Sequence, residues 1–248
     1  MGATSRSEPA DTQRQDAFVD AAFAFAVSLL IIAGGEPLAS FADLHLALAR
    51  IPAFACGFAL IALFWLAHRS WSRLSDARDG WTTFLSLAVV FAVLVFVFPL
   101  RLLTETATHF MSGGRLPGAG LMSGFEDLRW TYVIYGSAFG VLCALYVLLF
   151  AHAARALGGD PAREHAVSWT RTWGLAMAAA AVSCLTAISP LLPAAPWLPG
   201  AAYNLIPLGL AAVAVRRRFR AANDAPGPRP ERAAEGGSGG LDRGPKPG

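Results

Sequence analysis

Six long apolar segments constrain this chain more than any other feature of its sequence. Each approaches the length of about 20 residues that a helix needs to cross the hydrocarbon core of a bilayer. Hydrophobic residues make up 55% of the chain and charged residues 15%, whereas about 25% of a typical soluble domain is charged. The sequence therefore predicts an all-α, polytopic membrane protein with six transmembrane helices. The expected segments are residues 17–33, 51–68, 82–103, 130–152, 172–192 and 198–215.

Polar stretches flank the apolar segments at both ends of the sequence. Residues 1–13 are polar, and residues 216–248 are rich in Pro, Gly, Ala and charge. Such compositions bury too little apolar surface to fold alone, so both are predicted to be disordered tails around a transmembrane domain at 14–215. Arginines before the first segment also resemble the start of a signal peptide. The acid at position 20 argues against that interpretation, and so does the lack of an A-x-A site directly after the apolar run.

Arginines in the connections predict the orientation. They cluster after the second segment, after the fourth segment and at the start of the C-terminal tail, whereas the turn "SPLLPAAPWLPG" has none. Connections rich in arginine stay on the cytoplasmic side of a membrane. This arrangement predicts six spans with both termini in the cytoplasm.

Several functional classes find no support in the sequence. Basic and aromatic residues do not interleave as they do in nucleic-acid binding proteins, so no nucleic acid is expected as a partner. The three cysteines, Cys56, Cys143 and Cys184, each lie inside an apolar run and match no zinc or redox spacing, which favours structural thiols. No catalytic or metal-ligand spacing stands out. Neither an enzyme nor a bound cofactor is expected.

The first segment, "RQDAFVDAAFAFAVSLLII", carries an acid at its entrance. On a helical wheel five of its residues fall within about 60° of one another and form a stripe, while Asp20 points to a different face and Ser28 lies between the two. The stripe consists of Arg14, Phe18, Phe25, Leu29 and Ile32.

A carboxylate at this depth is costly and normally has a partner. The second segment ends "GFALIALFWLAHRSW" and would return antiparallel to the first, which places His68 at the depth of Asp20. Trp65, three residues earlier, shares the face of His68. We therefore expect an Asp20–His68 hydrogen bond with Arg14 nearby. The alternative is an ordinary packed helix with one satisfied acid, in which Trp65 and His68 are interfacial anchors.

These two stretches resemble the transmembrane protein 175 family of lysosomal and bacterial potassium channels, in its six-helix bacterial type. The first helix of that family carries R-x-x-x-F-S-D, and the second carries an S-F…F-W-x-x-H pattern. This chain has Val19 in place of the motif serine and Gly57 in place of the serine of the second helix. The matching residues are Arg14, Phe18, Asp20, Phe58, Phe64, Trp65 and His68.

The resemblance implies a homotetramer in a bacterial inner (plasma) membrane, with a central potassium-conducting pore lined by the first helix. Its partners would be the bilayer, potassium ions and further copies of itself, and conduction would involve no chemical step. Phe25, Leu29 and Ile32 would form a hydrophobic constriction with Ser28 close by. Phe25 stands where the family usually has isoleucine. The residues of the motif network would be Arg14, Phe18, Asp20, Trp65 and His68.

Two other classes of function stay open at this point. In one, the chain is a proton-coupled secondary transporter that uses Asp20 and His68 as a relay. In the other, it is a structural membrane protein that conducts no ions. A relay needs a water path to both side chains, whereas in a channel of this type they would face a neighbouring helix.

Overall fold

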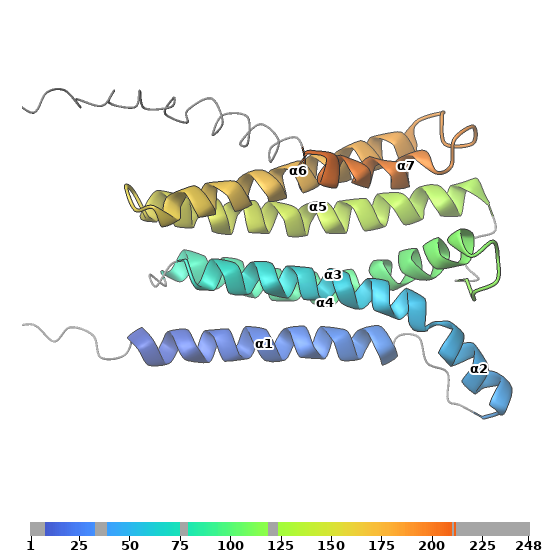
Figure 1. Cartoon of the computed structure of the whole chain (residues 1–248), viewed down its shortest axis with the longest axis horizontal. Helices are drawn as coiled ribbons and strands as arrows, with labels where there is room; N and C mark the ends of the chain where they lie inside the picture. Colours follow the sequence, from blue (N-terminus) through green and yellow to red (C-terminus); the bar gives the residue numbers. More distant parts are fainter. Residues whose placement is uncertain (1–7, 33–38, 75–78, 119–123, 210, 212–248) are drawn as a thin grey trace, which may run out of the picture. The chain divides into compact units, whose positions relative to one another are not determined.

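The computed structural model describes residues 8–32, 39–74, 79–118, 124–209 and 211. Apart from residue 211, all of these belong to one compact unit, Met1–Leu210. The regular secondary structure of the described residues is helical, as Figure 1 shows. The elements are α1 (Glu8–Ile32), α2 (Phe41–Ala49), α3 (Ile51–Ser72), α4 (Gly80–Met111), α5 (Phe125–Ala156), α6 (Ala162–Ile188), α7 (Leu198–Ala201) and the 3₁₀ helix η1 (Ala202–Asn204).

Five helices of the described part of the chain are long and apolar enough to cross a membrane. They are the helices α1, α3, α4, α5 and α6, and they correspond to the first five predicted segments. The predicted sixth segment, 198–215, begins with α7 and η1, and its residues 205–209 are helical as well. The rest of that segment and the predicted tail at 216–248 lie outside the described residues. The chain is thus a multi-pass membrane protein, and its sixth span stays a prediction.

The helices extend beyond the apolar runs that predict them. α1 begins at Glu8, so residues 8–13 are helical although the sequence predicted disorder for them. Their composition explains the difference, because a proline in the first turn and acids near a helix N-terminus both favour a helix start. α4 likewise continues to Met111. The connection after α1 contains α2, which Ser40 caps by accepting a hydrogen bond from the Asp43 N–H.

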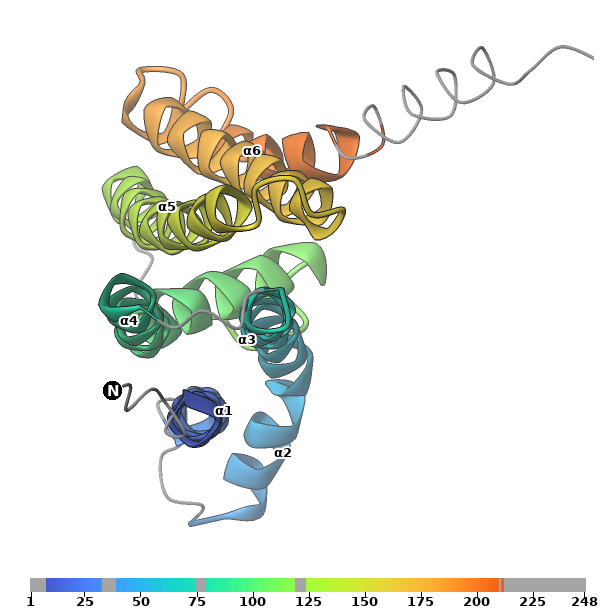
Figure 2. The same ribbon diagram turned by 90° about the vertical axis from the view of Figure 1, so that its left-hand side faces the viewer.

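The spans are arranged with α3 and α4 in the middle. α1 packs against α3 and α4, α4 also contacts α5, and α5 pairs along its length with α6. Seen along the helices, α3 and α4 lie between α1 and the α5–α6 pair (Figure 2). Because of this order, the spans of the described part of the chain pack against α1 on one side only.

Aromatic rings fill the centre between α3, α4, α5 and α6. Phe64 of α3 is fully buried and meets Phe96 of α4 edge to face, with ring centroids 5.8 Å apart. The Tyr146 ring of α5 stacks on Phe64 at 5.9 Å and on Trp173 of α6 at 4.6 Å. Aromatic pairs of this kind add stabilisation beyond the area they bury. The stack fixes α3 against the α5–α6 pair.

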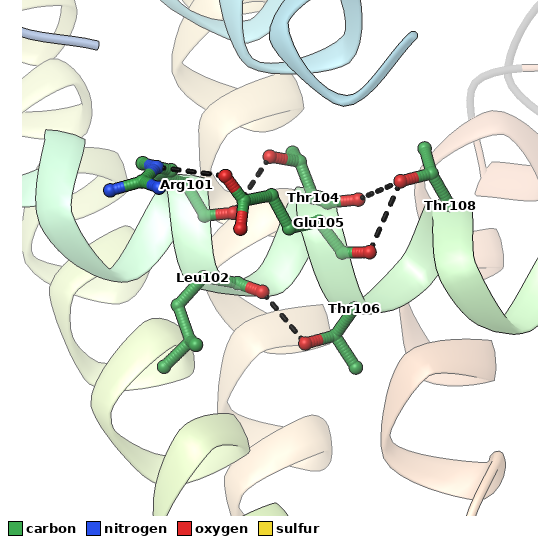
Figure 3. A network of polar contacts seen from close by, with 6 residues as sticks. All are labelled: Arg101, Leu102, Thr104, Glu105, Thr106 and Thr108. Atoms are coloured by element: carbon green, nitrogen blue, oxygen red, sulfur yellow. Dashed lines mark hydrogen bonds and ion pairs between the residues drawn. The ribbon is translucent and has the colours of Figure 1, made fainter. Parts of the chain in front are cut away.

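Polar side chains follow Pro99 in the last turns of α4, where Figure 3 shows them together. The Arg101 Nε donates to the Glu105 Oε1 at 2.8 Å, and Glu105 is almost fully buried. Three threonine hydroxyls donate to backbone carbonyls of the preceding turn, which satisfies them without water. These are Thr104 to Arg101, Thr106 to Leu102, and Thr108 to Thr104 and Glu105. Local pairing of this kind lets α4 stay helical beyond its apolar run.

Candidate functional site

α1 has one covered face and one uncovered face. Its covered face presents side chains at helical spacing to α3 and α4, and they are almost fully buried: Val19, Phe23, Ala26 and Leu30. Its most apolar window is only 22% buried inside the structure, against 44% for α4 and α5. The opposite face of α1 is therefore available to lipid, to an ion path or to another copy of the chain.

The predicted stripe lies mostly on the uncovered face. Phe25 is 54% exposed and Ile32 is 67% exposed, and Ser28 is exposed as well. The Ser28 hydroxyl donates to the Ala24 carbonyl at 3.2 Å, which leaves its oxygen lone pairs free to accept. Leu29 is half-buried and packs against the core, so it sits at the border of the two faces.

The acid of α1 is held by α3, but not through the predicted residue. The Asp20 Oδ1 accepts a hydrogen bond from the Trp65 Nε1 at 2.8 Å. The sequence pattern predicted His68 as the donor, and this prediction was wrong. A helical wheel shows only that Trp65 and His68 share a face, whereas the longer indole is the side chain that reaches the acid.

His68 instead points to α4. Its Nε2 lies 3.2 Å from the hydroxyl of Ser86, and both residues are buried. The predicted relay between Asp20 and His68 thereby loses the direct contact that suggested it. An indole N–H is also a donor only and does not titrate, so the Trp65–Asp20 bond anchors the acid and does not pass on protons.

Further polar contacts join α1 to its neighbours nearer its N-terminus. The Ser72 hydroxyl of α3 donates to the Asp16 Oδ2 at 2.8 Å. On the other side, the Thr83 hydroxyl of α4 lies 3.4 Å from the Gln15 Oε1. α1 is therefore attached to both of its neighbours by side-chain hydrogen bonds as well as by apolar packing.

Trp65 has a second polar neighbour. The guanidinium carbon of Arg69 lies 5.2 Å from the centroid of the indole ring, within the range of a cation–π contact. The indole thus meets the Asp20 carboxylate at its N–H edge and the Arg69 cation at its face. Arg14 and Phe18 are exposed on α1, and their membership of the motif network stays a prediction.

A close approach between α1 and α3 depends on Gly57. A Cβ added there would lie 2.9 Å from the Leu30 Cδ2. The position corresponds to the serine of the second-helix motif, and here the missing side chain leaves room for Leu30. The two helices can therefore pack closely at this level without a hydroxyl.

Sequence analysis missed Ser86, Ser72, Asp16 and Tyr146 as supports of this site. Ser86 carried a usable signal, since it is a hydroxyl within an apolar run and His68 reaches the same depth on an antiparallel helix. The Tyr146 hydroxyl donates to the Phe64 carbonyl at 2.6 Å. No sequence pattern predicts that contact, because its acceptor is a backbone atom 82 residues away.

The chemistry of these groups is that of structural support. In the described ranges no three His, Cys, Asp or Glu side chains gather where they could hold a metal ion. The described contacts of Asp20, Trp65, His68 and Ser86 fix helices relative to one another. The Trp65–Asp20 hydrogen bond joins α3 to α1, and the His68–Ser86 contact joins α3 to α4.

The chain is similar to known proteins in sequence over part of its length and in fold over most of it. A curated relative described as a potassium channel, from Marivirga tractuosa, is 31% identical over 100 residues, which are 40% of this chain and 40% of that protein. The alignment thus spans well under half of the relative's length.

Two solved structures share the fold. A crystal structure of a threonine-to-alanine variant of the potassium channel MtTMEM175, in complex with a nanobody–MBP fusion, matches with a TM-score of 0.67 and 21% identity, covering 84% of this chain and 93% of that one. The structure of a lysosomal potassium-selective channel TMEM175 homolog from Chamaesiphon minutus matches with a TM-score of 0.54 and 20% identity, covering 79% and 96%.

The family model described as the endosomal/lysosomal potassium channel TMEM175 matches residues 14–99. This range contains most of α1 with Asp20, all of α3 with Trp65 and His68, and the first part of α4 with Ser86. The matched residues are well under half of the 248 residues of the chain, and over them the chain is similar to a family described as a potassium channel.

Proposed function

We propose that this protein is a potassium-permeable ion channel in which copies of α1 surround a central pore as a homotetramer. The observation that carries the proposal is the exposed face of α1. It bears Phe25, Ser28 and Ile32, while the opposite face is anchored to α3 and α4. The names of the similar proteins support potassium as the ion.

The uncovered face has the properties that a pore constriction needs. Phe25 and Ile32 lie two turns apart on it, with Leu29 at its border. Rings of such side chains around a symmetry axis would exclude water. An ion passing them would lose hydration without carbonyl groups to replace it, and hydrophobic constrictions of this kind can gate a pore by dewetting. Ser28 would supply the nearby hydroxyl.

The anchored face has the complementary task in this proposal. Pore helices that rotate or tilt would change the width of the constriction. The Trp65–Asp20 and Ser72–Asp16 hydrogen bonds resist such rotation, because each joins a defined position of α1 to α3. We therefore assign the motif network a structural role in conduction, with Arg14 and Phe18 as further proposed members. A bacterial inner membrane would be the setting.

Flux in proteoliposomes tests this function. Potassium uptake into vesicles containing the purified chain should follow the potassium gradient and persist when no proton gradient is present. Uptake that requires a proton gradient would instead indicate a coupled transporter, and an absence of flux would indicate a structural membrane protein. Native mass spectrometry in detergent should show the mass of four chains, and a stable monomer would contradict the proposed pore.

A further inference from the structure

Tyr146 makes a contact that none of the motifs includes. It lies in the middle of α5, is fully buried, and donates its hydroxyl proton to the Phe64 carbonyl of α3 at 2.6 Å. Most side-chain hydrogen bonds inside the described helices reach only three or four residues back along the chain, as at Thr104, Thr106 and Thr108. The Tyr146 bond joins two different spans.

The acceptor lies in the turn of α3 that carries the motif residues Trp65 and His68. In an α-helix the carbonyl of residue 64 also receives the N–H of residue 68, so the Tyr146 hydroxyl shares its acceptor with the turn from Phe64 to His68. Trp65 leaves this turn toward Asp20 of α1, and His68 leaves it toward Ser86 of α4. A hydrogen bond at the Phe64 carbonyl therefore affects the backbone from which both the Trp65 and the His68 side chains extend.

The rings restrict the same turn from the side. Tyr146 stacks on Phe64 with 9° between the ring planes, and its other stacking partner is Trp173 of α6. Stacking restricts how far α3 can move away from α5, but it leaves sliding along the rings possible. The hydrogen bond adds a fixed point to the stack, since it is directional and its acceptor is backbone.

We propose that Tyr146 is a positioning residue: its hydroxyl sets the height and rotation of the Phe64–His68 turn, and through Trp65 it sets how α1 presents its uncovered face. The inference rests on the proposed channel function for its consequence in conduction. Its structural part, the path from α5 through α3 to α1, stands independently. α5, in the second half of the chain, would thus affect the orientation of α1, although the two helices share few contacts.

Tyr146→Phe tests the hydroxyl while keeping the stacked ring. Tyr135→Phe is the matched control, because Tyr135 is buried on the same face of α5 and stacks on Phe139 of its own helix. The chain contains seven tryptophans, so labelling with 5-fluorotryptophan gives a countable set of fluorine NMR resonances. The resonance that disappears in Trp65→Phe identifies Trp65.

We expect Tyr146→Phe to shift or broaden the Trp65 resonance, and Tyr135→Phe to leave it in place. A shift at Trp173 alone would overturn the inference, since Trp173 touches the Tyr146 ring directly and needs no path through α3. The measurement is made on the full-length protein in detergent and requires no ion flux. It therefore decides the positioning role even if the chain proves not to conduct.

A double-mutant cycle provides the second test. Trp65→Phe removes the donor to Asp20 and keeps a ring in place. If Tyr146 acts through Trp65, the two substitutions should not be additive. The equilibrium constant of unfolding in the double variant should then rise by less than the product of the two single effects, and the difference should be roughly a factor of three or more. Additive effects would overturn the inference.

Potassium flux into vesicles tests the consequence for conduction. Tyr146→Phe should change the flux by roughly a factor of two or more, while Tyr135→Phe leaves it unchanged. Equal flux in both variants would contradict the link to conduction.

Discussion

α1 and α5 are both membrane-length helices, but they differ in what surrounds them. The most apolar window of α5 is twice as buried as that of α1, at 44% against 22%. α5 packs between α4 and α6, whereas α1 meets α3 and α4 with one face only. α5 is held by buried rings, whereas α1 is held by apolar packing of its covered face together with side-chain hydrogen bonds at defined positions. α5 is thus part of a packed scaffold formed by α3, α4, α5 and α6, whereas α1 is a helix that this scaffold holds with one face exposed.

The largest expected effect comes from a cavity in the scaffold. Leu142 of α5 is fully buried, so Leu142→Ala should destabilise the protein by about 2–5 kcal/mol. Lost packing contacts dominate this effect, because lipid tails are as apolar as leucine. Ile32→Ala on the exposed face of α1 is the control and should change stability by less than about 1 kcal/mol. Unfolding by sodium dodecyl sulfate in mixed micelles measures both. Equal losses would show that the face of α1 is as covered as the core.

The next effect concerns the attachment of α1. Asp20→Ala removes the acceptor of the Trp65 N–H, and a lost partner of a charged hydrogen bond costs about 1–3 kcal/mol. We expect a lower yield and weaker assembly, measured by size-exclusion chromatography of the solubilised protein. Asp20→Asn is the matched variant and should retain more of both, because an amide oxygen still accepts. A fully assembled Asp20→Ala protein with normal conductance and altered ion preference would contradict the anchoring role.

The sequence alone predicted the membrane-spanning helices better than the contacts that attach α1 to them. Long apolar runs mark spans because the bilayer demands them, and five of the predicted segments correspond to helices. The helix ends were less visible, since α1 and α4 continue into polar sequence. For the site, the wheel separated Asp20 from the Phe25 face, but it did not distinguish Trp65 from His68 as the partner. The Tyr146–Phe64 bond lay beyond prediction, because backbone carbonyls look alike in a sequence.

The uncovered face should control conduction. If Phe25 forms the constriction, basal conductance is low, and Phe25→Ala should raise it about tenfold, equivalent to about 1.4 kcal/mol. Phe23, only 4% exposed, faces the core, so Phe23→Ala should affect conductance little and stability more. Phe23→Leu is added as a control that keeps most of the packing. Unitary currents in planar bilayers measure the conductance. An increase in either Phe23 variant without one in Phe25→Ala would place the pore on the other face of α1.

A smaller effect is expected where α5 meets the start of α4. The Asp79 side chain accepts from the Thr82 N–H at 2.8 Å and lies 3.0 Å from the His152 Nε2 of α5. Hydrogen bonds from Thr82, and then the nearby His152, lower the pKa of Asp79 below its usual value of 3.8. A carboxyl with a lowered pKa stabilises the fold above its unfolded pKa and loses this contribution as the pH falls through the folded value.

Asp79→Asn isolates that contribution, because asparagine caps a helix about as well as aspartate. Between pH 6 and pH 3, the wild-type thermal midpoint should fall more than that of the variant. The difference corresponds to less than about 1 kcal/mol, since Asp79 is half-exposed and its charge is screened. Parallel curves would show that the charge of Asp79 contributes nothing to the junction of α4 and α5.

The smallest effect is expected from a change in the sequence outside α1 and α5. Residues 216–248 carry eight basic and four acidic residues and show no apolar periodicity. Truncation after Arg220 keeps the arginines that favour a cytoplasmic position for this end of the last predicted span, so assembly and flux should stay unchanged. A second truncation that also removes Arg216, Arg217, Arg218 and Arg220 is the matched comparison and should disturb insertion, measured by protease accessibility in membrane vesicles. If truncation after Arg220 already abolishes assembly, the tail contributes to the stability of the scaffold. The contrast between the scaffold and α1 would then have to take the tail into account.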